Sequence, residues 1–233
     1  MIPKIIHYIW LGGEKDEIIQ KAIHTWKKRA PEFRIIEWNE KNLPKYENSF
    51  YQEALKDKNY AIASDYARLS ILKKYGGVYM DTDMFLLANP SNLLTNKDLV
   101  FGIQNKDIIF SAGFIASIPG QEFISRALNV YNRVEYNKEK LIANTALLSP
   151  LMFSMYEFEH KAKTQVRGKV VAYNPNVLLQ PSFKSVAMHI GEKAWMDHTI
   201  HDKLRIRFRQ HITNQLEAGI FAIVNNIGRK IIP

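Results

Sequence analysis

The N-terminal part of the chain alternates between apolar and amphipathic segments. Residues 2–10 are apolar at almost every position, which is typical of a strand buried on both faces, as in a parallel sheet. After a Gly-Gly turn, apolar side chains recur at helical spacing over residues 18–26, with Asp16 as the expected N-cap, and residues 33–38 follow as a second strand. This order predicts a parallel βαβ unit with a right-handed crossover.

A longer amphipathic segment leads into a very short strand. After a short helix over residues 49–56, we expect a helix over residues 59–75, with Gly76 as its C′ residue. Residues 78–80 then form a strand so short that Asp81 must lie at its carboxyl end. The end of this helix therefore leads directly into the strand that ends at Asp81.

The later part of the chain shows the same kinds of pattern. Strands are expected over residues 99–103, 108–110, 113–117, 170–173 and 187–190. Helices are expected over about fifteen residues from Gln121, and over residues 144–157 with a break near Pro150. No internal repeat, low-complexity tract or interdomain linker is visible. We expect one α/β domain over residues 1–202 and a C-terminal helical tail over residues 203–233.

The tail has the pattern of a basic amphipathic helix. Its apolar positions recur on one helical face, and they are Leu204, Phe208, Ile212, Leu216, Ile220, Ile223, Val224 and Ile227. Basic side chains crowd its first turns, namely Arg205, Arg207, Arg209 and His211. Such a helix either lies on an anionic membrane or packs on the core with a solvated basic face. The sequence leaves both open.

The net charge and its distribution indicate what kind of partner the protein binds. The net charge is +9, and residues 203–233 contribute +5 of it, because they hold six Lys and Arg against one Glu. A basic nucleic-acid-binding protein is one interpretation of this charge, but the charge is concentrated in the tail and no nucleic-acid-binding motif is present. We therefore expect no nucleic-acid partner and an anionic surface met by the tail.

Other bulk properties exclude several kinds of site. The chain has no Cys, so it has no disulfide, no thiolate zinc site and no cysteine nucleophile. No run reaches the roughly 18–20 apolar residues that a membrane-spanning helix requires, and the start lacks the pattern of a signal peptide. We expect a soluble or peripheral protein.

Asp81 and Asp83 are spaced to point toward the same small volume at a strand end. Two carboxylates that close repel unless a cation neutralises them, and Mn²⁺ or Mg²⁺ does so with oxygen ligands while leaving positions free for phosphate oxygens. Ligands of open α/β sheets bind at this end of the strands. A surface turn with two solvated aspartates is the simplest alternative. A haloacid-dehalogenase-like phosphatase is another, but its Asp-x-Asp usually follows the first strand of the fold.

The preceding helix adds three polar side chains. Ser64, Asp65 and Arg68 lie within about 100° of one another on a helical wheel, so they share one face. Arg68 can offer a planar fork to a phosphate or to sugar hydroxyls, and Asp65 can accept from hydroxyls. The alternative is a structural Asp65–Arg68 ion pair at i,i+3.

The chain resembles the glycosyltransferases with a DXD sugar-binding motif in three stretches. These are residues 2–10 (IPKIIHYIW), Ser64-Asp65-x-x-Arg68 and Tyr75-Gly76-Gly77-Val78-Tyr79-x-Asp81-x-Asp83. The family includes fungal initiating mannosyltransferases and bacterial capsule and lipopolysaccharide enzymes, and the large clostridial glucosylating toxins have a similar pattern. The resemblance is dense over residues 1–90 and loose afterwards. It implies a GT-A fold with a mostly parallel, Rossmann-like central sheet flanked by helices, a nucleotide-sugar donor, Mn²⁺ or Mg²⁺, and retention of anomeric configuration.

The resemblance also implies roles for the motif residues on the base and sugar side of the donor. Trp10 would stack on the nucleotide base, and Ile9 would line that pocket. Ser64 and Asp65 would contact the ribose or the donor sugar, and Arg68 would hold the sugar or the diphosphate. The alternative for Trp10 is a core aromatic at a strand end, but the Gly-Gly turn directly after it favours close approach of a ligand.

The implied phosphate and metal side draws on the second motif and on a later segment. Tyr79 would flank the phosphates, and Asp83 would ligate the metal, with Asp81 reaching the metal or the ribose. Relatives often carry a late His and a Ser-Trp pair near the diphosphate. Here His189 is the candidate ligand and Trp195 lies near the donor, although Ala194 replaces the Ser of that pattern.

Two further assignments complete the expected site. Lys193 could touch the diphosphate in compensation for Ala194, and residues 111–113 fall where acceptor or donor-sugar contacts are expected. His189 could instead be an ordinary core or surface histidine. His7, inside the first strand, is expected to be structural.

The expected mechanism centres on Asp81, Asp83 and Arg68. No carboxylate stands out as a nucleophile with a partner acid, so we expect metal-assisted departure of the nucleoside diphosphate and attack by the acceptor hydroxyl on the same face. The toxin-like pattern around Trp10 favours a UDP-hexose such as UDP-galactose or UDP-glucose, with GDP-mannose as the alternative. The acceptor is expected to be an oligosaccharide or a lipid-linked saccharide, in bacterial surface or capsular polysaccharide synthesis. We expect a cytoplasmic protein, peripheral on the inner face of the plasma membrane.

Overall fold

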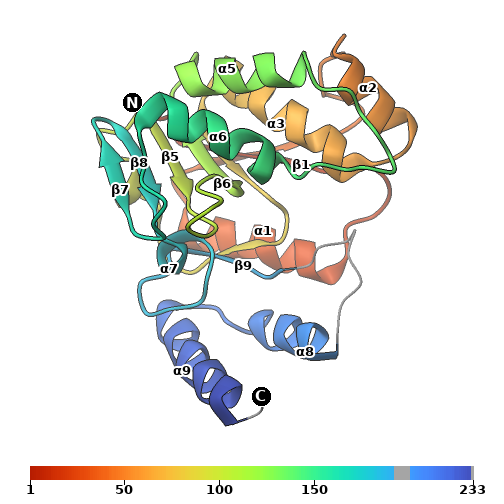
Figure 1. The fold of residues 1–233 in the computed structure, drawn as a ribbon. Helices are drawn as coiled ribbons and strands as arrows, with labels where there is room; N and C mark the ends of the chain where they lie inside the picture. The colour runs from red at the N-terminus through yellow and green to blue at the C-terminus, as the bar shows by residue number, and fades with distance from the viewer. Residues whose placement is uncertain (192–199, 232–233) are drawn as a thin grey trace.

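The computed structural model describes residues 1–191 and 200–231 of the chain (Figure 1). The strands in these ranges are β1 (Ile5–Ile9), β2 (Arg34–Trp38), β3 (Gly77–Met80), β4 (Met84–Leu86), β5 (Leu99–Gly102), β6 (Ser111–Ser117), β7 (Gln165–Arg167), β8 (Val170–Tyr173) and β9 (Ala187–His189). The helices are α1 (Glu17–Arg29), α2 (Ser49–Lys56), α3 (Tyr60–Tyr75), α4 (Ser91–Leu94), α5 (Glu122–Tyr131), α6 (Asn144–Tyr156), α7 (Pro175–Leu178), α8 (Ile200–Arg209) and α9 (Gln215–Ile231).

A central sheet organises the domain. In the described chain its seven strands follow the order β2-β1-β3-β6-β5-β8-β7. β1 is parallel to both β2 and β3, and β5 is parallel to β8, whereas β6 and β7 run against their neighbours. Five strands therefore share one direction, which confirms the expected mostly parallel α/β sheet. The predicted βαβ unit at the start is β1-α1-β2.

The sheet has an apolar core on each face, and helices cover both (Figure 1). Helices α2, α3, α5 and α6 lie over one face, while α1, α7 and the β4–β9 pair lie over the other. Successive side chains of a strand point to opposite faces of the sheet and therefore pack in different cores. Along β3, Tyr79 packs in the first core, on the α3 side, whereas Val78 and Met80 pack in the second core, on the α1 side. Burial on both faces explains why the N-terminal strand is apolar at nearly every position.

The Gly-Gly step between α3 and β3 is a steric requirement. Gly76 has a φ of +62° and Gly77 a φ of +91°. A Cβ on Gly76 would lie 2.8 Å from the main-chain nitrogen of Pro119 and from the carbonyl oxygen of Ser117, and one on Gly77 would lie 2.8 Å from the carbonyl oxygen of Ile5. Only glycine fits a left-handed backbone packed this closely, so the turn fixes where α3 ends and β3 begins.

A second, two-stranded sheet was not predicted. β4 pairs antiparallel with β9, and Met84 stands opposite His189. Because β4 starts directly after the Asp81–Asp83 turn, this pairing brings a segment from late in the chain beside the two aspartates. The prediction of a strand near residues 187–190 was right, and its partner explains why it matters.

Three local predictions were wrong. The helix expected over about fifteen residues from Gln121 has ten residues and ends at Tyr131. No strand forms over residues 108–110, because the side chain of Asn105 accepts hydrogen bonds from the main chain of Asp107 and Ile108 and holds this segment as a turn. Helix α6 does not break at Pro150. The hydroxyl of Ser149 bonds the carbonyl of Thr145 at 2.6 Å inside the continuous helix.

The C-terminal tail forms two helices, α8 and α9, where the sequence suggested one continuous stripe. The break follows from local capping. The Asn214 side chain accepts from the main-chain N–H of Glu217, and the Glu217 carboxylate accepts from the main-chain N–H of Thr213 at 2.6 Å. Ile206, Ile212 and Ala218 pack against the second core. Within the described ranges, no helix combines the length and apolarity needed to cross a bilayer.

Candidate functional site

Arg68 lies at the centre of a buried polar network at the carboxyl end of β3. Its guanidinium bonds Asp65 at 2.8 Å and Asp81 at 3.0 Å, and it also donates to the carbonyl of Ala112 and to both the hydroxyl and the carbonyl of Ser64. These contacts use the full set of five N–H groups that an arginine carries. Arg68 is 5% exposed, so the network holds α3, β3 and β6 together from the inside.

Ser64 and Asp65, which the resemblance assigned to the sugar side of the donor, are also buried, on one face of α3. Asn144, the first residue of α6, donates to Asp65 at 2.5 Å. Burial raises the pKa of Asp65 to about 7, although the adjacent Arg68 opposes the rise. Asn144 was missed from the sequence, because a helix-starting asparagine far along the chain carries no motif.

Three candidate metal ligands meet beside this network. The ligand atoms of Asp81, Asp83 and His189 lie within 4.8 Å of one another. His189 Nε2 lies 3.0 Å from Asp83 Oδ2, and the main-chain N–H of Ile190 donates to the carbonyl of Asp83. The turn after β3 and strand β9 thus present two carboxylates and one imidazole to the same point.

The electrostatics of this cluster suit a divalent cation. Burial and the nearby charge of Asp83 raise the pKa of Asp81 against the opposing effect of Arg68. Burial would lower the pKa of His189, but the contact with Asp83 outweighs it and raises that pKa. Two carboxylate oxygens and an imidazole nitrogen are ligands that Mn²⁺ accepts. The residues therefore fit the metal that the sequence predicted.

Gly113 keeps one side of the cluster open. A Cβ at this position would lie 3.4 Å from Asp81 Oδ2, 3.7 Å from the His189 ring and 3.3 Å from Met84 Sδ. Any side chain would therefore occupy the space beside the ligand atoms. The main chain of Gly113 also accepts from the N–H of Asp81, which fixes the aspartate against β6.

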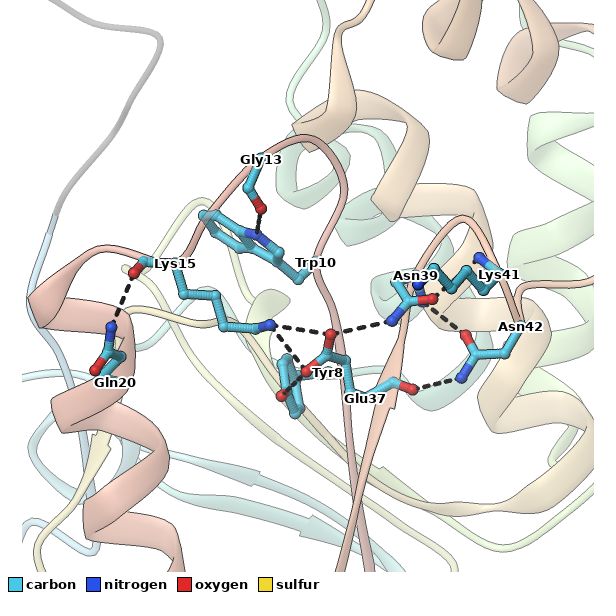
Figure 2. Close-up of polar contacts among 9 residues, drawn as sticks. All are labelled: Tyr8, Trp10, Gly13, Lys15, Gln20, Glu37, Asn39, Lys41 and Asn42. Atoms are coloured by element: carbon cyan, nitrogen blue, oxygen red, sulfur yellow. Dashed lines mark hydrogen bonds and ion pairs between the residues drawn. The ribbon is translucent and has the colours of Figure 1, made fainter.

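The edge of the sheet that holds the cluster also holds Trp10. In the β1–β3 pairing His7 stands opposite Tyr79, so two residues further along, Ile9 and Asp81 end neighbouring strands. Ile9 is buried, whereas Trp10 is partly exposed directly after it. Figure 2 shows the Trp10 indole beneath the loop that follows β1, with its N–H donating to the carbonyl of Gly13 at 3.0 Å.

Glu37, near the end of β2, ties this loop to the sheet (Figure 2). Its carboxylate accepts from the hydroxyl of Tyr8, from Lys15 at 3.0 Å and from Asn39 at 3.1 Å. Burial would raise the pKa of Glu37, but these hydrogen bonds lower it on balance. Glu37 thus stays charged and anchors Lys15, which fixes the path of the chain that follows Trp10.

Gly12 closes the same loop against α3. Its N–H donates to Glu40 at 2.7 Å, and its φ is +77°. A Cβ there would lie 2.3 Å from the ring of Tyr60, at the start of α3. The Gly-Gly turn therefore permits the loop to pass Tyr60.

Two of the predicted residues are interior supports. The ring of Tyr79 is 2% exposed and lies under the Arg68 guanidinium, 4.6 Å from it. His7 is fully buried; its Nε2 bonds the carbonyl of Gly76 and its Nδ1 accepts from the indole of Trp38. His7 is therefore structural, as the sequence predicted. Lys193 and Trp195 lie outside the described residues.

Arg209, on α8, contacts the main chain of His189. It is buried, and it donates to the carbonyl of His189 at 3.1 Å and to the side chain of Gln180 at 3.1 Å. The sequence did not single out Arg209, because it is one of several basic residues on that helix.

Residues 16–100 match the protein family described as glycosyltransferase sugar-binding region containing DXD motif. This part of the chain belongs to the DXD glycosyltransferases. The matched region holds α3, β3, Arg68 and both aspartates, and the family resemblance drawn from the sequence is thereby confirmed. His189 and Asn144 reach the DXD glycosyltransferase region from outside the match.

Known relatives of the DXD glycosyltransferase region cover different shares of the chain. Inositol phosphoceramide mannosyltransferase 1 of Schizosaccharomyces pombe is 24% identical over 164 residues, which are 67% of this chain and 51% of that protein. Toxin A of Clostridium novyi is 54% identical over 47 residues, which are 20% of this chain and 2% of the toxin. The chain thus spans about half of the yeast relative and a small part of the toxin.

Solved structures confirm the GT-A fold. The PaToxG glycosyltransferase superposes with a TM-score of 0.52 at 21% identity, and the match covers 66% of this chain and 68% of that one. At this level of identity the likeness shows the fold alone. The expected α/β architecture, with a mostly parallel sheet between helices, is therefore confirmed.

Proposed function

We propose that the chain is a metal-dependent, retaining glycosyltransferase that moves a hexose from a nucleotide sugar to a saccharide acceptor. The observation that carries the proposal is the meeting of Asp81, Asp83 and His189 at the carboxyl end of β3, within and beside the DXD region. Open α/β sheets bind ligands at this end of their strands. The buried Arg68 network lies directly against these ligands.

Asp81, Asp83 and His189 would hold Mn²⁺, with Mg²⁺ as the alternative. The imidazole favours Mn²⁺, because Mg²⁺ prefers an all-oxygen shell. When bound, the ion supplies positive charge to a leaving diphosphate. Asp81 is oriented for this work by Arg68 and by the main chain of Gly113.

The donor would lie between the metal ligands and Trp10. Trp10 would stack on the base, because its ring is held by Gly13 and is partly exposed at the adjoining strand end. Ile9 would line the same pocket. Lys193 and Trp195 remain proposed contacts of the diphosphate and the donor.

Asp65 and Ser64 would contact the donor sugar from α3, and Arg68 would hold their side chains in position. The five N–H groups of Arg68 already have protein partners, so we propose that Arg68 positions Asp65 and Asp81. Tyr79 supports the guanidinium from the interior, and through it would act on the phosphate side of the donor.

The reaction is proposed to retain anomeric configuration without a covalent intermediate. The described carboxylates nearest the cluster, Asp65, Asp81 and Asp83, are engaged by Arg68 or His189, which disfavours a free nucleophile. The acceptor hydroxyl would attack on the face that the diphosphate leaves, and the leaving phosphate would take its proton. A trapped glycosyl-enzyme would contradict this mechanism.

We infer a UDP-hexose donor, such as UDP-galactose or UDP-glucose. The toxin-like pattern of Trp10 and Ser64-Asp65 supports it, whereas the yeast relative carries mannosyltransferase in its name and supports a mannose donor, GDP-mannose, as the alternative. The proposed acceptor is an oligosaccharide or a lipid-linked saccharide of a bacterial surface or capsular polysaccharide, with residues 203–233 peripheral on the inner face of the plasma membrane.

A donor-hydrolysis screen over UDP- and GDP-sugars with Mn²⁺ tests the proposal. The intact chain should hydrolyse one donor slowly, and Asp83→Asn should lower that rate by about a hundredfold or more, because it removes a charged ligand. Asp107→Asn, in an exposed loop, is the matched control and should keep the rate. Stabilisation by a nucleic-acid duplex, without any effect of UDP or GDP plus Mn²⁺ on thermal unfolding, would favour the nucleic-acid-binding alternative.

A further inference from the structure

Each of the two tail helices exposes large apolar side chains. Of the eleven large hydrophobic side chains that are exposed in the described chain, six lie on α8 and α9: Leu204, Phe208, Leu216, Ile220, Ile223 and Val224. They are between 47% and 64% exposed. These six belong to the stripe that the sequence showed, in which Ile212 is buried and the side chain of Ile227 lies outside the described part, and they face away from the core. We call these six residues the tail face.

The tail face is continuous on each helix. On α9, Leu216, Ile220, Ile223 and Val224 fall within about 100° of a helical wheel, and the buried Ala218 lies on the opposite side. On α8, Leu204 and Phe208 are one turn apart, whereas Ile206 and Arg209 point to the core. Each helix therefore packs through one face and leaves a second apolar face open.

Basic residues border the tail face. Lys203 and Arg207 are exposed on α8 beside Leu204 and Phe208. At the other side, the end of α1 brings Lys28 and Arg29 to a hollow of about 520 Å³, which Leu216 of the tail face also lines. The other lining residues are Leu87, Ala88, Asn89, Asn214 and Gln215.

The positive charge at the hollow has no acidic partner among the residues that the structure describes. Arg29 is held there by a 2.6 Å hydrogen bond to the carbonyl of Thr213. Glu32 and Glu217 are near the rim and stay charged, but Glu32 lies 4.0 Å from Lys4, and Glu217 accepts from Thr213 rather than from Lys28 or Arg29. The hollow thus offers two cations, amide groups and an apolar edge.

We propose that the tail face docks on an anionic bilayer, with a lipid phosphate headgroup in the hollow beside Lys28 and Arg29. An apolar strip bordered by cations complements the boundary between acyl chains and anionic headgroups. A second copy of the chain would also cover the apolar strip, but each copy carries a net charge of +9 and would meet these cations with further positive charge. The charge therefore favours the bilayer.

The proposed function places residues 203–233 at the membrane, and the present proposal adds which side chains contact the bilayer. It rests on that function only for the location of the acceptor, because binding to vesicles needs no donor and no turnover. α8 carries Arg207 outward and Arg209 inward to the carbonyl of His189. Docking would therefore place α8 between the bilayer and the proposed metal ligands.

Vesicle co-sedimentation of the full chain tests it. We expect binding to vesicles of phosphatidylcholine with phosphatidylglycerol, little binding to phosphatidylcholine alone, and weakening as salt rises. The double variant Phe208→Ser/Ile220→Ser should bind at least about tenfold more weakly, because two large apolar groups are lost. Lys28→Glu should weaken binding to anionic vesicles roughly tenfold and leave binding to neutral vesicles unchanged.

Matched controls keep the test sharp. Val166→Ser, an equally exposed apolar residue on β7, and Lys106→Glu, in an exposed loop, should bind anionic vesicles like the intact chain. All variants should keep the thermal unfolding temperature and the donor-hydrolysis rate, so a failed glycosyltransferase assignment stays separate from a failed docking surface. Point substitutions are used because truncation would also remove Arg209.

Three results would overturn the proposal. They are equal binding to neutral and anionic vesicles, unchanged binding of Phe208→Ser/Ile220→Ser, and a dimer seen by light scattering that this double variant abolishes. The last result would assign the tail face to a second copy.

Discussion

Arg209 of α8 donates a hydrogen bond of 3.1 Å to the main-chain carbonyl of His189, whose side chain lies 3.0 Å from Asp83. The C-terminal tail therefore contacts the strand that carries the candidate metal ligand His189. β9 is only three residues long, and its pairing with β4 is its sheet contact in the described chain. The Arg209 contact is thus a second fixing point for His189.

The first prediction concerns this contact. Arg209→Ala should weaken Mn²⁺ binding about tenfold, because residues that orient a metal ligand typically have effects of this size. Electron paramagnetic resonance of free Mn²⁺ during a titration measures the affinity directly, without turnover. Arg209→Lys should recover part of the affinity, because a lysine can make one of the two bonds.

Arg207→Ala is the matched control for Arg209, since it is exposed on the same helix. It should leave the Mn²⁺ affinity unchanged. If Arg209→Ala lowered the unfolding temperature while the Mn²⁺ affinity stayed the same, Arg209 would only hold the tail in place.

The sequence predicted the first half of the fold well because its signals are local. Asp16 caps α1 through a 3.0 Å bond to the N–H of Ile19, and α2 begins and ends at the residues expected for the short helix. The Gly76-Gly77 turn is required by close backbone contacts, so it marks the boundary before β3. Helical period, caps and glycine turns are all visible in a few neighbouring residues.

The contacts that complete the site depend on tertiary structure. Strands β4 and β9 have three residues each, too few to show a period, so the position of His189 beside Asp83 could not be derived from spacing. For Arg68 the sequence left open a fork toward the donor and an ion pair with Asp65. The ion pair forms, and the sequence does not show that the carbonyl of Ala112 also meets the guanidinium. The tail has two apolar faces, and periodicity alone does not say which one packs.

The second prediction concerns Arg68 as a buried counter-charge. Arg68→Met should destabilise the fold by about 3–5 kcal/mol, because it leaves Asp65 and Asp81 without their shared cation. Urea unfolding followed by circular dichroism gives the free energy of unfolding. The double variant Asp65→Asn/Arg68→Met should recover part of the loss, since one of the buried charges is then gone.

The comparison for Arg68 is an exposed arginine that also pairs with an acid. Arg126 bonds Glu122 one helical turn away on α5. Arg126→Met should cost about 0.5 kcal/mol or less, as exposed ion pairs do. Equal losses for the two arginines would show that burial of the Arg68 network does not determine its stability.

The third prediction separates the two interpretations of Trp10. If the ring stacks on the donor base, Trp10→Ala should weaken nucleoside diphosphate binding by about 1–3 kcal/mol, while Trp10→Phe keeps most of the affinity. Isothermal titration with UDP and with GDP in the presence of Mn²⁺ measures it. Unchanged affinity together with lower stability in Trp10→Ala would make Trp10 a core aromatic at a strand end.

The fourth prediction uses the buried His7. Burial lowers the pKa of His7 to about 4, from an ordinary value of 6.5, and its two ring nitrogens are committed to Gly76 and Trp38 as acceptor and donor partners. Below pH 6.5 the unfolded chain therefore binds a proton that the folded chain refuses. The stabilising contribution is complete above pH 6.5 and is lost progressively as the pH falls toward 4.

The size of this effect follows from the shift of the pKa. At 1.36 kcal/mol per unit, His7 should account for a loss of about 3 kcal/mol in the free energy of unfolding between pH 6.5 and 4. His7→Gln keeps a donor and an acceptor but does not titrate, so its unfolding free energy should fall less steeply over this range. His24→Gln, exposed on α1, should follow the intact chain. Parallel curves for the intact chain and His7→Gln would show that His7 does not refuse the proton, and that the Gly76 and Trp38 contacts do not fix its neutral form.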